Sequence, residues 1–316
     1  MEKVNCDICN GNGADIFYKL QSPDFPEELF SLMKCKECGL LFINPRPGKE
    51  KIKKYYPDKE YYAYSQAENE LQTQDKNKIE KLIDSLRRIT VNEYYANKEN
   101  LPVFIKLKTK FLAFFGKHRF GSAPRKLKVG SILDIGCGDG QFLSSLKELG
   151  WKVKGVEVNS YATKKARQRD LDVYNKNMLD INFEKERFNV VRLWSVLEHL
   201  HQPSRTLRKI NQILEEDGFL IIQVPNFGSA ARKIFKKKWS AFDAPRHLYS
   251  FNQKTLKKIT EKNNFEVFKM YTMSVGTIEA SLKFHHPIIK PFLFVFDMFL
   301  DIFNLGDCLV CYAKKK

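Results

Sequence analysis

Two Cys-x2-Cys pairs stand near the start of the sequence, Cys6 with Cys9 and Cys35 with Cys38. Each pair places two thiols on one tight turn, and two such turns supply the four ligands of a tetrahedral zinc ion. Gly39 follows the second pair and allows the positive φ or close backbone approach that such a turn needs. Because four thiolates leave no position open for water, the pattern predicts one structural Zn2+. The alternative, four ordinary buried cysteines, does not explain the paired spacing.

A third pair with this spacing, Cys308 and Cys311, lies inside the apolar run Cys-Leu-Val-Cys-Tyr. Residues three apart on a strand face opposite sides of a sheet. We therefore predict that these two cysteines are small apolar strand residues and not metal ligands.

The segment Leu-Asp-Ile-Gly-Cys-Gly-Asp-Gly places alternating glycines at Gly136, Gly138 and Gly140. Such a loop lets the backbone approach a nucleotide-like ligand closely. A dinucleotide-binding loop has its third glycine one place later, where this chain has Gln141, which argues against a nicotinamide cofactor. Glu157 ends the next apolar run, where a carboxylate can accept hydrogen bonds from both ribose hydroxyls. The alternative is a merely tight turn, which leaves Glu157 unexplained.

From Lys126 onward, short apolar runs alternate with amphipathic helices, which is typical of a parallel α/β sheet. Gly150 closes the first of these helices, and Ser160 is the expected N-cap of the second. The predicted strands cover residues 131–135, 152–158, 188–194, 218–224, 265–271 and 308–313. The predicted helices cover residues 141–149, 160–169, 203–214 and 253–263.

The chain has 316 residues, of which 43% are hydrophobic and 29% charged, and it carries a net charge of +17. This composition suits a soluble globular protein and excludes disordered and collagen-like classes. The sequence starts with no apolar core of the secretory type. The longest apolar stretch, 287–300, is interrupted by Lys290, Pro291 and Asp297 and is shorter than the roughly 20 residues of a membrane span. These features predict a cytoplasmic protein.

The positive charge is concentrated in residues 102–128, where phenylalanines interleave with Lys and Arg, and in residues 232–238. Three interpretations remain open: solvated surface lysines, a site for a phosphate-rich substrate, and nucleic-acid binding through stacked bases. Residues 292–303 form a strongly apolar helix candidate, either a core or dimer helix or one that makes peripheral membrane contact.

Taken together, several segments resemble the class I S-adenosylmethionine-dependent methyltransferases. The resemblance is carried by the glycine segment 134–140, by Val-Glu-Val-Asn at 156–159, and by 188–200, 214–220 and 225–226. It extends to Trp-Ser-Ala-Phe-Asp-Ala-Pro-Arg-His-Leu at 239–248. With Cys-Lys-Glu-Cys-Gly-Leu at 35–40 and Asn-Pro-Arg-Pro at 44–47, the chain resembles the subgroup that has an N-terminal zinc-binding segment. Many members of that subgroup are associated with sugar or cell-surface glycan metabolism.

The resemblance implies S-adenosylmethionine as cofactor and a set of residues that bind it. The backbone of the three glycines would run past its methionine part, and Glu157 would hold the ribose. Asp134, in the same motif as the glycines, would also belong to the cofactor site. Asn177 and Met178 would flank the adenine, and Leu193 and Trp194 would line the pocket. Asn177 stands where the family often has an Asp, but its side-chain carbonyl can still accept a hydrogen bond from the adenine amine.

Methyl transfer to a hydroxyl or carbon acid also needs a base. His199 is the first candidate, and His247 is the second. The alternatives are that Glu198 and His199 pin the following helix, and that His247 packs in a lid segment. Arg246 is a candidate anchor for a phosphate or carboxylate.

These observations predict an α/β protein with a doubly wound, mostly parallel, seven-stranded Rossmann-like sheet. The predicted domains are a zinc-binding segment (1–48), a mainly helical basic connector (49–125) and a methyltransferase domain (126–316) with a substrate or lid region at about 227–250. The predicted activity is methyl transfer to a small or glycan-type acceptor, such as a sugar, nucleotide-sugar or lipid-linked sugar. The alternatives are an RNA or protein methyltransferase and a catalytically inactive cofactor-binding scaffold.

Overall fold

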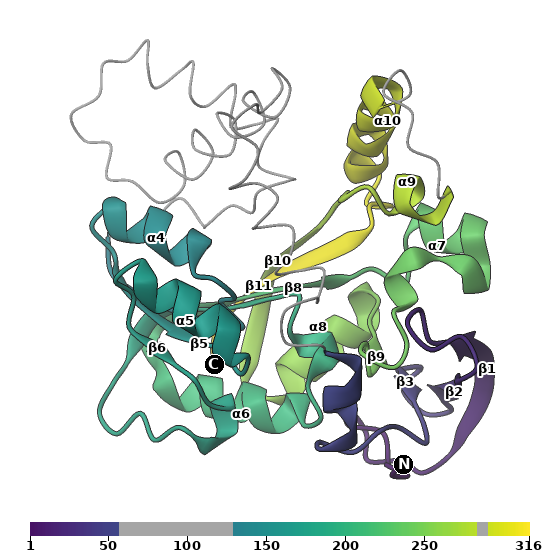
Figure 1. Ribbon diagram of the computed structural model, residues 1–316, viewed down its shortest axis with the longest axis horizontal. Helices are drawn as coiled ribbons and strands as arrows, with labels where there is room; N and C mark the ends of the chain where they lie inside the picture. Colours follow the sequence, from purple (N-terminus) through teal and green to yellow (C-terminus); the bar gives the residue numbers. More distant parts are fainter. Residues whose placement is uncertain (57–128, 283–289) are drawn as a thin grey trace. The chain divides into compact units, whose positions relative to one another are not determined.

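The computed structural model describes residues 1–56, 129–282 and 290–316 (Figure 1). Most of the predicted connector and the basic run at 102–128 lie outside these residues. Contacts divide the chain into two compact units, Pro57–Arg192 and a second unit made of Met1–Tyr56 with Leu193–Lys316. The N-terminal segment and residues 193–316 therefore form one unit.

In the unit Pro57–Arg192, apolar runs form buried parallel strands joined by helices. β4 (Ser131–Ile135) pairs in parallel with β5 (Lys152–Val156), and β5 pairs with β6 (Val173–Tyr174). The connecting helices are α4 (Gln141–Glu148) and α5 (Ser160–Gln168), followed by the short η2 (Met178–Asp180). β5 ends two residues earlier than predicted, so Glu157 lies just beyond it.

The N-cap of α5 differs from the prediction. Asn159, not Ser160, has the extended backbone of an N-cap, and its side chain accepts a hydrogen bond from the N–H of Ala162 at 2.8 Å. The Ser160 hydroxyl instead donates to Asn175 Oδ1. Both residue types cap helices well, and the backbone at the end of β5 decides between them.

The other unit contains a small antiparallel sheet that combines distant segments. β1 (Ala14–Gln21), β2 (Leu29–Cys35) and β3 (Leu41–Ile43) follow one another, and β9 (Tyr249–Ser250) completes the sheet beside β3. Their buried side chains share a hydrophobic core with Trp239 and Phe242. The predicted lid region thus packs on the N-terminal segment through an apolar core.

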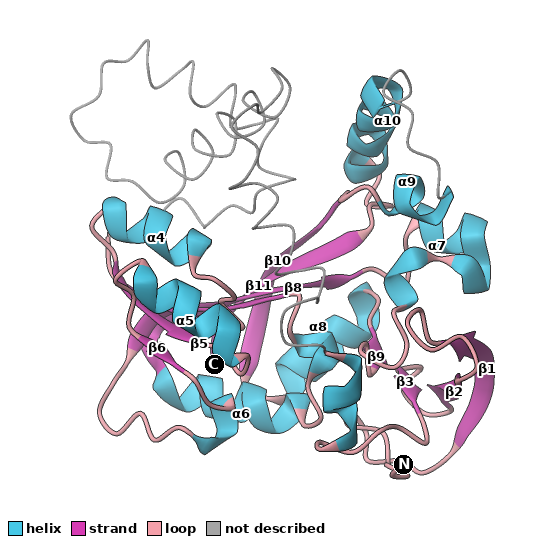
Figure 2. Ribbon diagram, viewed as in Figure 1, coloured by secondary structure: helices cyan, strands magenta, loops and turns pink. Residues whose placement is uncertain are grey.

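The large sheet has seven strands in the order β10-β11-β8-β7-β4-β5-β6. Figure 2 draws the strands in magenta and the helices in cyan. β7 (Phe188–Trp194) has the predicted bounds, and β8 (Leu214–Pro225) is longer than predicted. β11 (Cys308–Lys315) runs antiparallel between β8 and β10 (Phe265–Met273). This mostly parallel α/β sheet confirms the predicted fold class. Cys308 and Cys311 are buried in β11.

The remaining helices connect these strands. The long amphipathic ones are α6 (Pro203–Ile213) and α8 (Gln253–Lys262), close to their predicted bounds. α10 (Lys290–Ile302) begins two residues before the predicted apolar helix. Among the described helices, none is long and apolar enough to cross a membrane. The shorter helices are η1 (Lys51–Tyr55), η3 (Leu197–His199), α7 (Ala230–Phe235), η4 (Lys236–Lys238), η5 (Ser240–Phe242) and α9 (Thr277–Leu282).

The cap of α5 gives a stability prediction. Asn159→Ala removes an acceptor for a helix N–H and should lower the free energy of unfolding by about 1 kcal/mol. Ser160→Ala removes only an exposed side-chain contact and should cost less than about 0.5 kcal/mol. Urea denaturation of the three proteins measures both values, and an equal or larger cost for Ser160→Ala would show that the cap is assigned to the wrong residue.

Candidate functional site

The glycine loop after β4 adopts a backbone that requires glycine. Gly136, Gly138 and Gly140 all have positive φ, at 73°, 56° and 78°. A Cβ at Gly140 would lie 2.3 Å from the Leu171 side chain and 3.1 Å from the Cβ of Ala166, so this glycine permits close packing against α5 and the residues that follow it. A Cβ at Gly138 would meet nothing within 4 Å, which leaves the middle of the loop open to a ligand.

Glu157 is bound to this loop by backbone hydrogen bonds. The N–H of Gly138 donates to Oε2 at 3.0 Å, and the N–H of Asn159 donates to Oε1 at 2.8 Å. Burial raises the pKa of Glu157, whereas these N–H donors act to lower it. Each carboxylate oxygen keeps a further lone pair, so the side chain can still accept ribose hydroxyls. The glycine loop and Glu157, which the sequence predicts to bind one ligand together, are therefore in contact.

Asp134 of the glycine motif has a partner that the sequence analysis missed. Arg192 Nη1 lies 3.0 Å from both carboxylate oxygens of Asp134, and its guanidinium lies over the Phe142 ring, 4.0 Å from the centroid. Burial raises the pKa of Asp134, and the charge of Arg192 opposes that shift. The pair fixes the end of β4, where the glycine loop begins.

The four remaining cofactor candidates differ in exposure. Asn177 is exposed and caps η2, where its Oδ1 accepts the N–H of Leu179 at 2.9 Å, and Met178 is buried. Leu193 is fully buried, and Trp194 is half-buried. Asn175, which the sequence analysis missed, donates from Nδ2 to the backbone carbonyl of Glu157 at 3.0 Å. It therefore links the segment before Asn177 to the acid.

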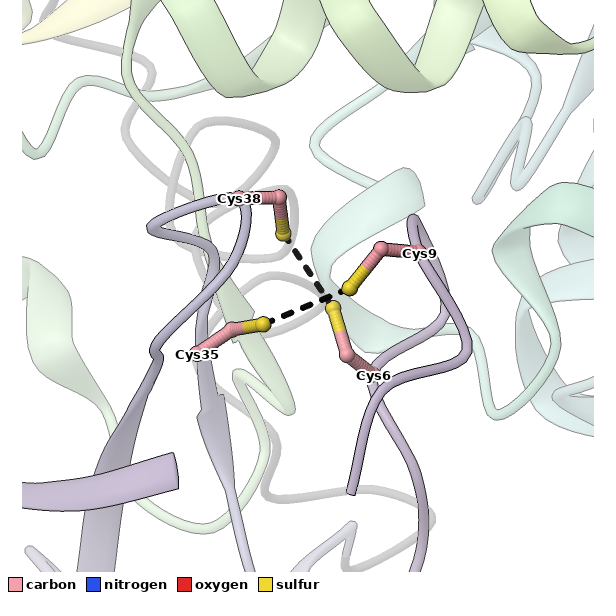
Figure 3. A group of neighbouring side chains, drawn as sticks. All are labelled: Cys6, Cys9, Cys35 and Cys38. Carbon is pink, nitrogen blue, oxygen red and sulfur yellow. Dashed lines mark hydrogen bonds between the residues drawn. The ribbon is translucent and has the colours of Figure 1, made fainter. Parts of the chain in front are cut away.

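The four N-terminal cysteines converge, as Figure 3 shows. Their sulfur atoms all lie within 4.8 Å of one another, with 3.3 Å between Cys6 and Cys38 and 3.4 Å between Cys9 and Cys35. Gly39 has φ 77°, and its N–H donates to the Cys35 carbonyl, so the tight turn forms as predicted. Burial raises the pKa of Cys6, and it raises the pKa of Cys9 to about 11.

The two candidate bases lie side by side. The rings of His199 and His247 have centroids 4.6 Å apart and meet edge to face. Burial and the neighbouring His247 lower the pKa of His199 to about 3, and burial also lowers the pKa of His247. Both imidazoles are therefore neutral at physiological pH, because burial disfavours the charged imidazolium form of each.

Arg246, the candidate anchor for an anion, is already paired. Its guanidinium binds Asp243 and Asp24, and it also donates to the carbonyl of Tyr55. It is buried and structural, and it fixes the turn that carries His247. The basic residues Lys236–Lys238 of η4 are exposed.

Comparison with known proteins agrees with this geometry. A family model described as a methyltransferase domain matches residues 104–269. The chain belongs to that family. The match covers the glycine loop, Glu157 and the two histidines. The methyltransferase-domain assignment thus confirms the coarse part of the predicted resemblance.

Two curated relatives of the methyltransferase are ubiquinone biosynthesis O-methyltransferases. The mitochondrial protein of Candida albicans is 33% identical over 106 residues, which cover 30% of this chain and 32% of that protein. The protein of Pelagibacter ubique is 24% identical over 184 residues, 51% of this chain and 72% of that protein. The chain spans about a third to a half of the length of several curated relatives that it matches.

Among solved structures, an S-adenosylmethionine-dependent methyltransferase from Thermotoga maritima is similar to this methyltransferase. It is 20% identical, with a TM-score of 0.46, and the alignment covers 67% of this chain and 98% of that chain. One from Archaeoglobus fulgidus is 20% identical, with a TM-score of 0.45.

The buried ion pair beside the glycine loop can be tested by mutation. Arg192→Ala leaves the Asp134 carboxylate buried and unpaired, and it should lower the free energy of unfolding by about 3–5 kcal/mol. Lys147→Ala, which breaks the exposed ion pair with Asp170, serves as control and should leave stability unchanged. Chemical denaturation measures both, and equal stability of the two variants would contradict a structural role for Arg192.

Proposed function

We propose that this methyltransferase transfers the methyl group of S-adenosylmethionine to a hydroxyl group of a small or glycan-type acceptor. The open glycine loop joined by hydrogen bonds to Glu157 is the observation that carries this proposal. The names of the curated relatives support an oxygen acceptor. The protein's positive charge is compatible with a phosphorylated acceptor, such as a nucleotide-linked or lipid-linked sugar.

The donor would be held by the residues around the loop. Gly136, Gly138 and Gly140 would let the backbone approach its methionine part, and Glu157 would accept both ribose hydroxyls. The resemblance assigns the adenine to Asn177 and Met178 and the pocket lining to Leu193 and Trp194. Asp134 would act through Arg192 by fixing the loop, because its own oxygens face that guanidinium.

The transfer itself is a displacement at the methyl carbon. A lone pair of the acceptor oxygen forms the new C–O bond, and the electron pair of the C–S bond goes to sulfur, which leaves as the thioether S-adenosylhomocysteine. The hydroxyl proton passes to an imidazole nitrogen of His199 or His247. His247 Nδ1 faces the carbonyl of Ala241, and His199 Nδ1 faces the Tyr56 hydroxyl and the carbonyl of Arg246. When Nδ1 donates its hydrogen to these oxygens, Nε2 holds the lone pair that accepts the proton.

The cysteine cluster fits a structural zinc ion. In a tetrahedral site with Zn–S bonds of about 2.3 Å the sulfur atoms are about 3.8 Å apart, close to the separations in this cluster. Cys6, Cys9, Cys35 and Cys38 would bind as thiolates, and the ion would tie the first turn to the end of β2. It would supply stability and no chemistry.

Calorimetric titration tests the donor site. We expect the wild-type protein to bind S-adenosylmethionine and S-adenosylhomocysteine, and Glu157→Ala to bind both about 10- to 100-fold more weakly, because it loses hydrogen bonds to a charged group. Glu148→Ala, on the exposed face of α4, is the matched control and should bind as the wild type does. A folded wild-type protein that binds neither ligand would contradict the proposal.

Turnover tests the acceptor and the base. Methyl transfer from labelled S-adenosylmethionine should be found with hydroxyl-bearing sugars or nucleotide-sugars and not with RNA or protein. His199→Ala or His247→Ala should lower kcat by about 10²- to 10⁴-fold without weakening donor binding, because a general base contributes that much. His201→Ala is the control. If both variants keep wild-type turnover, neither histidine is the base.

Metal analysis tests the zinc proposal. Cys35→Ser should contain one zinc ion fewer per chain than the wild type and should unfold at a lower temperature, since a structural zinc contributes folding free energy. Cys308→Ser, which alters a buried cysteine of β11, should keep the wild-type zinc content. A folded wild-type protein without zinc would refute the site.

A further inference from the structure

A second group of side chains, distinct from the cysteines, brings two imidazole nitrogens and one carboxylate oxygen together. It consists of Glu198, His199 and His247, one ligand atom from each lying within 4.8 Å of the others. His199 Nε2 is 3.9 Å from Glu198 Oε1. All three side chains belong to the unit that contains Leu193–Lys316.

The Nδ1 atom of each histidine faces away from the cluster and has its own partner. His247 Nδ1 lies 2.8 Å from the carbonyl of Ala241, which only accepts, so this nitrogen carries the hydrogen and Nε2 keeps its lone pair. His199 Nδ1 lies 2.8 Å from the Tyr56 hydroxyl oxygen and 3.1 Å from the carbonyl of Arg246, and both oxygens can accept its hydrogen when Nε2 binds an ion. A backbone carbonyl that fixes the far nitrogen is the usual support of a histidine that binds a metal.

The carboxylate of Glu198 is buried without hydrogen-bond partners among the described residues. Its side chain is 1% exposed, and within the described part of the chain neither carboxylate oxygen has a hydrogen-bond partner. A buried carboxylate without a partner costs free energy unless a cation neutralises it. Its unsatisfied oxygens therefore point independently to a ligand with positive charge.

The surrounding charges also favour a cation. Asp243 Oδ2 lies 3.9 Å from His247 Nε2. The nearby cation, Arg246, is neutralised by its pairs with Asp243 and Asp24. The cluster thus has acceptor atoms and negative charge around it, and the described residues bring no unpaired cationic side chain to it.

We infer that Glu198, His199 and His247 bind a divalent transition-metal ion. Two imidazoles and one carboxylate suit Zn2+, Fe2+, Co2+ or Mn2+, whereas the four thiolates favour softer metal ions. Ligand bonds of about 2.1 Å would draw the three atoms closer than they are in the free cluster. Three protein ligands leave at least one position open, unlike the closed four-cysteine site.

The role of this ion rests on the proposed function. An acceptor hydroxyl that occupies the open position would lose its proton more readily, because the ion stabilises the alkoxide. With the ion bound, the two histidines would act as ligands in place of the proton acceptor proposed above, because Nε2 has no second lone pair, and the released proton would pass to solvent. The presence of the ion is tested without turnover, so the site and the methyl-transfer proposal can fail separately.

Cobalt titration of the chelator-stripped protein separates the two metal sites. Co2+ bound by thiolates gives an intense near-ultraviolet charge-transfer band, and Co2+ bound by nitrogen and oxygen gives only weak visible bands. We expect the wild type to bind one ion of the second class. Glu198→Gln and His247→Ala should lose that ion, or bind it at least about tenfold more weakly, and keep the charge-transfer class.

Two matched variants serve as controls. His201→Ala changes a histidine whose Nε2 faces the carbonyl of Pro47, outside the cluster, and it should keep both classes. Cys35→Ser should lose the charge-transfer class alone. A wild-type protein without the nitrogen–oxygen class, or Glu198→Gln and His247→Ala proteins that retain it at full affinity, would overturn the inference. S-adenosylmethionine titration of the same samples reports separately on the proposed function and on folding.

Discussion

The backbone of Leu248 makes two hydrogen bonds on which the arrangement of the histidine cluster depends. Its carbonyl accepts the N–H of Ile43 at 2.9 Å, and its N–H donates to the carbonyl of Glu198 at 2.8 Å. These bonds join the N-terminal sheet, the turn that carries His247 and the turn that carries Glu198. The two bonds therefore hold in place the backbone segments from which the Glu198 and His247 side chains extend.

Three buried carboxylates differ in how the fold compensates for their lost hydration. Glu157 accepts backbone N–H groups, and Asp134 is paired with a guanidinium. Glu198 has neither kind of partner among the described residues, and burial raises its pKa to about 8, with the charge of Asp243 adding to the shift. The first two groups are already satisfied within the fold. Of the three, Glu198 alone has carboxylate oxygens with no partner among the described residues, which leaves both for a ligand to bind.

The sequence predicted the elements whose signal is local. β7 is a mostly apolar run, and its bounds were predicted correctly. The sequence also predicted that the four N-terminal cysteines lie together and that the glycine loop lies beside Glu157. β9 was missed because two residues show no periodicity, and it exists only through pairing with β3. The Asp134–Arg192 pair had a detectable signal, since each is the lone charged residue of an otherwise apolar or uncharged strand. The unsatisfied state of Glu198 had none, because it depends on tertiary burial.

The pairing of β3 with β9 has a consequence for biosynthesis. Residues 44–248 separate the two strands in the chain, so the N-terminal sheet has an unpaired edge while they are being translated. At about 5–20 residues per second, this edge stays open for roughly 10–40 s. The cysteine turns of the nascent chain emerge long before their supporting strand. Until β9 is made, β3 therefore exposes backbone N–H and C=O groups that another chain could pair with.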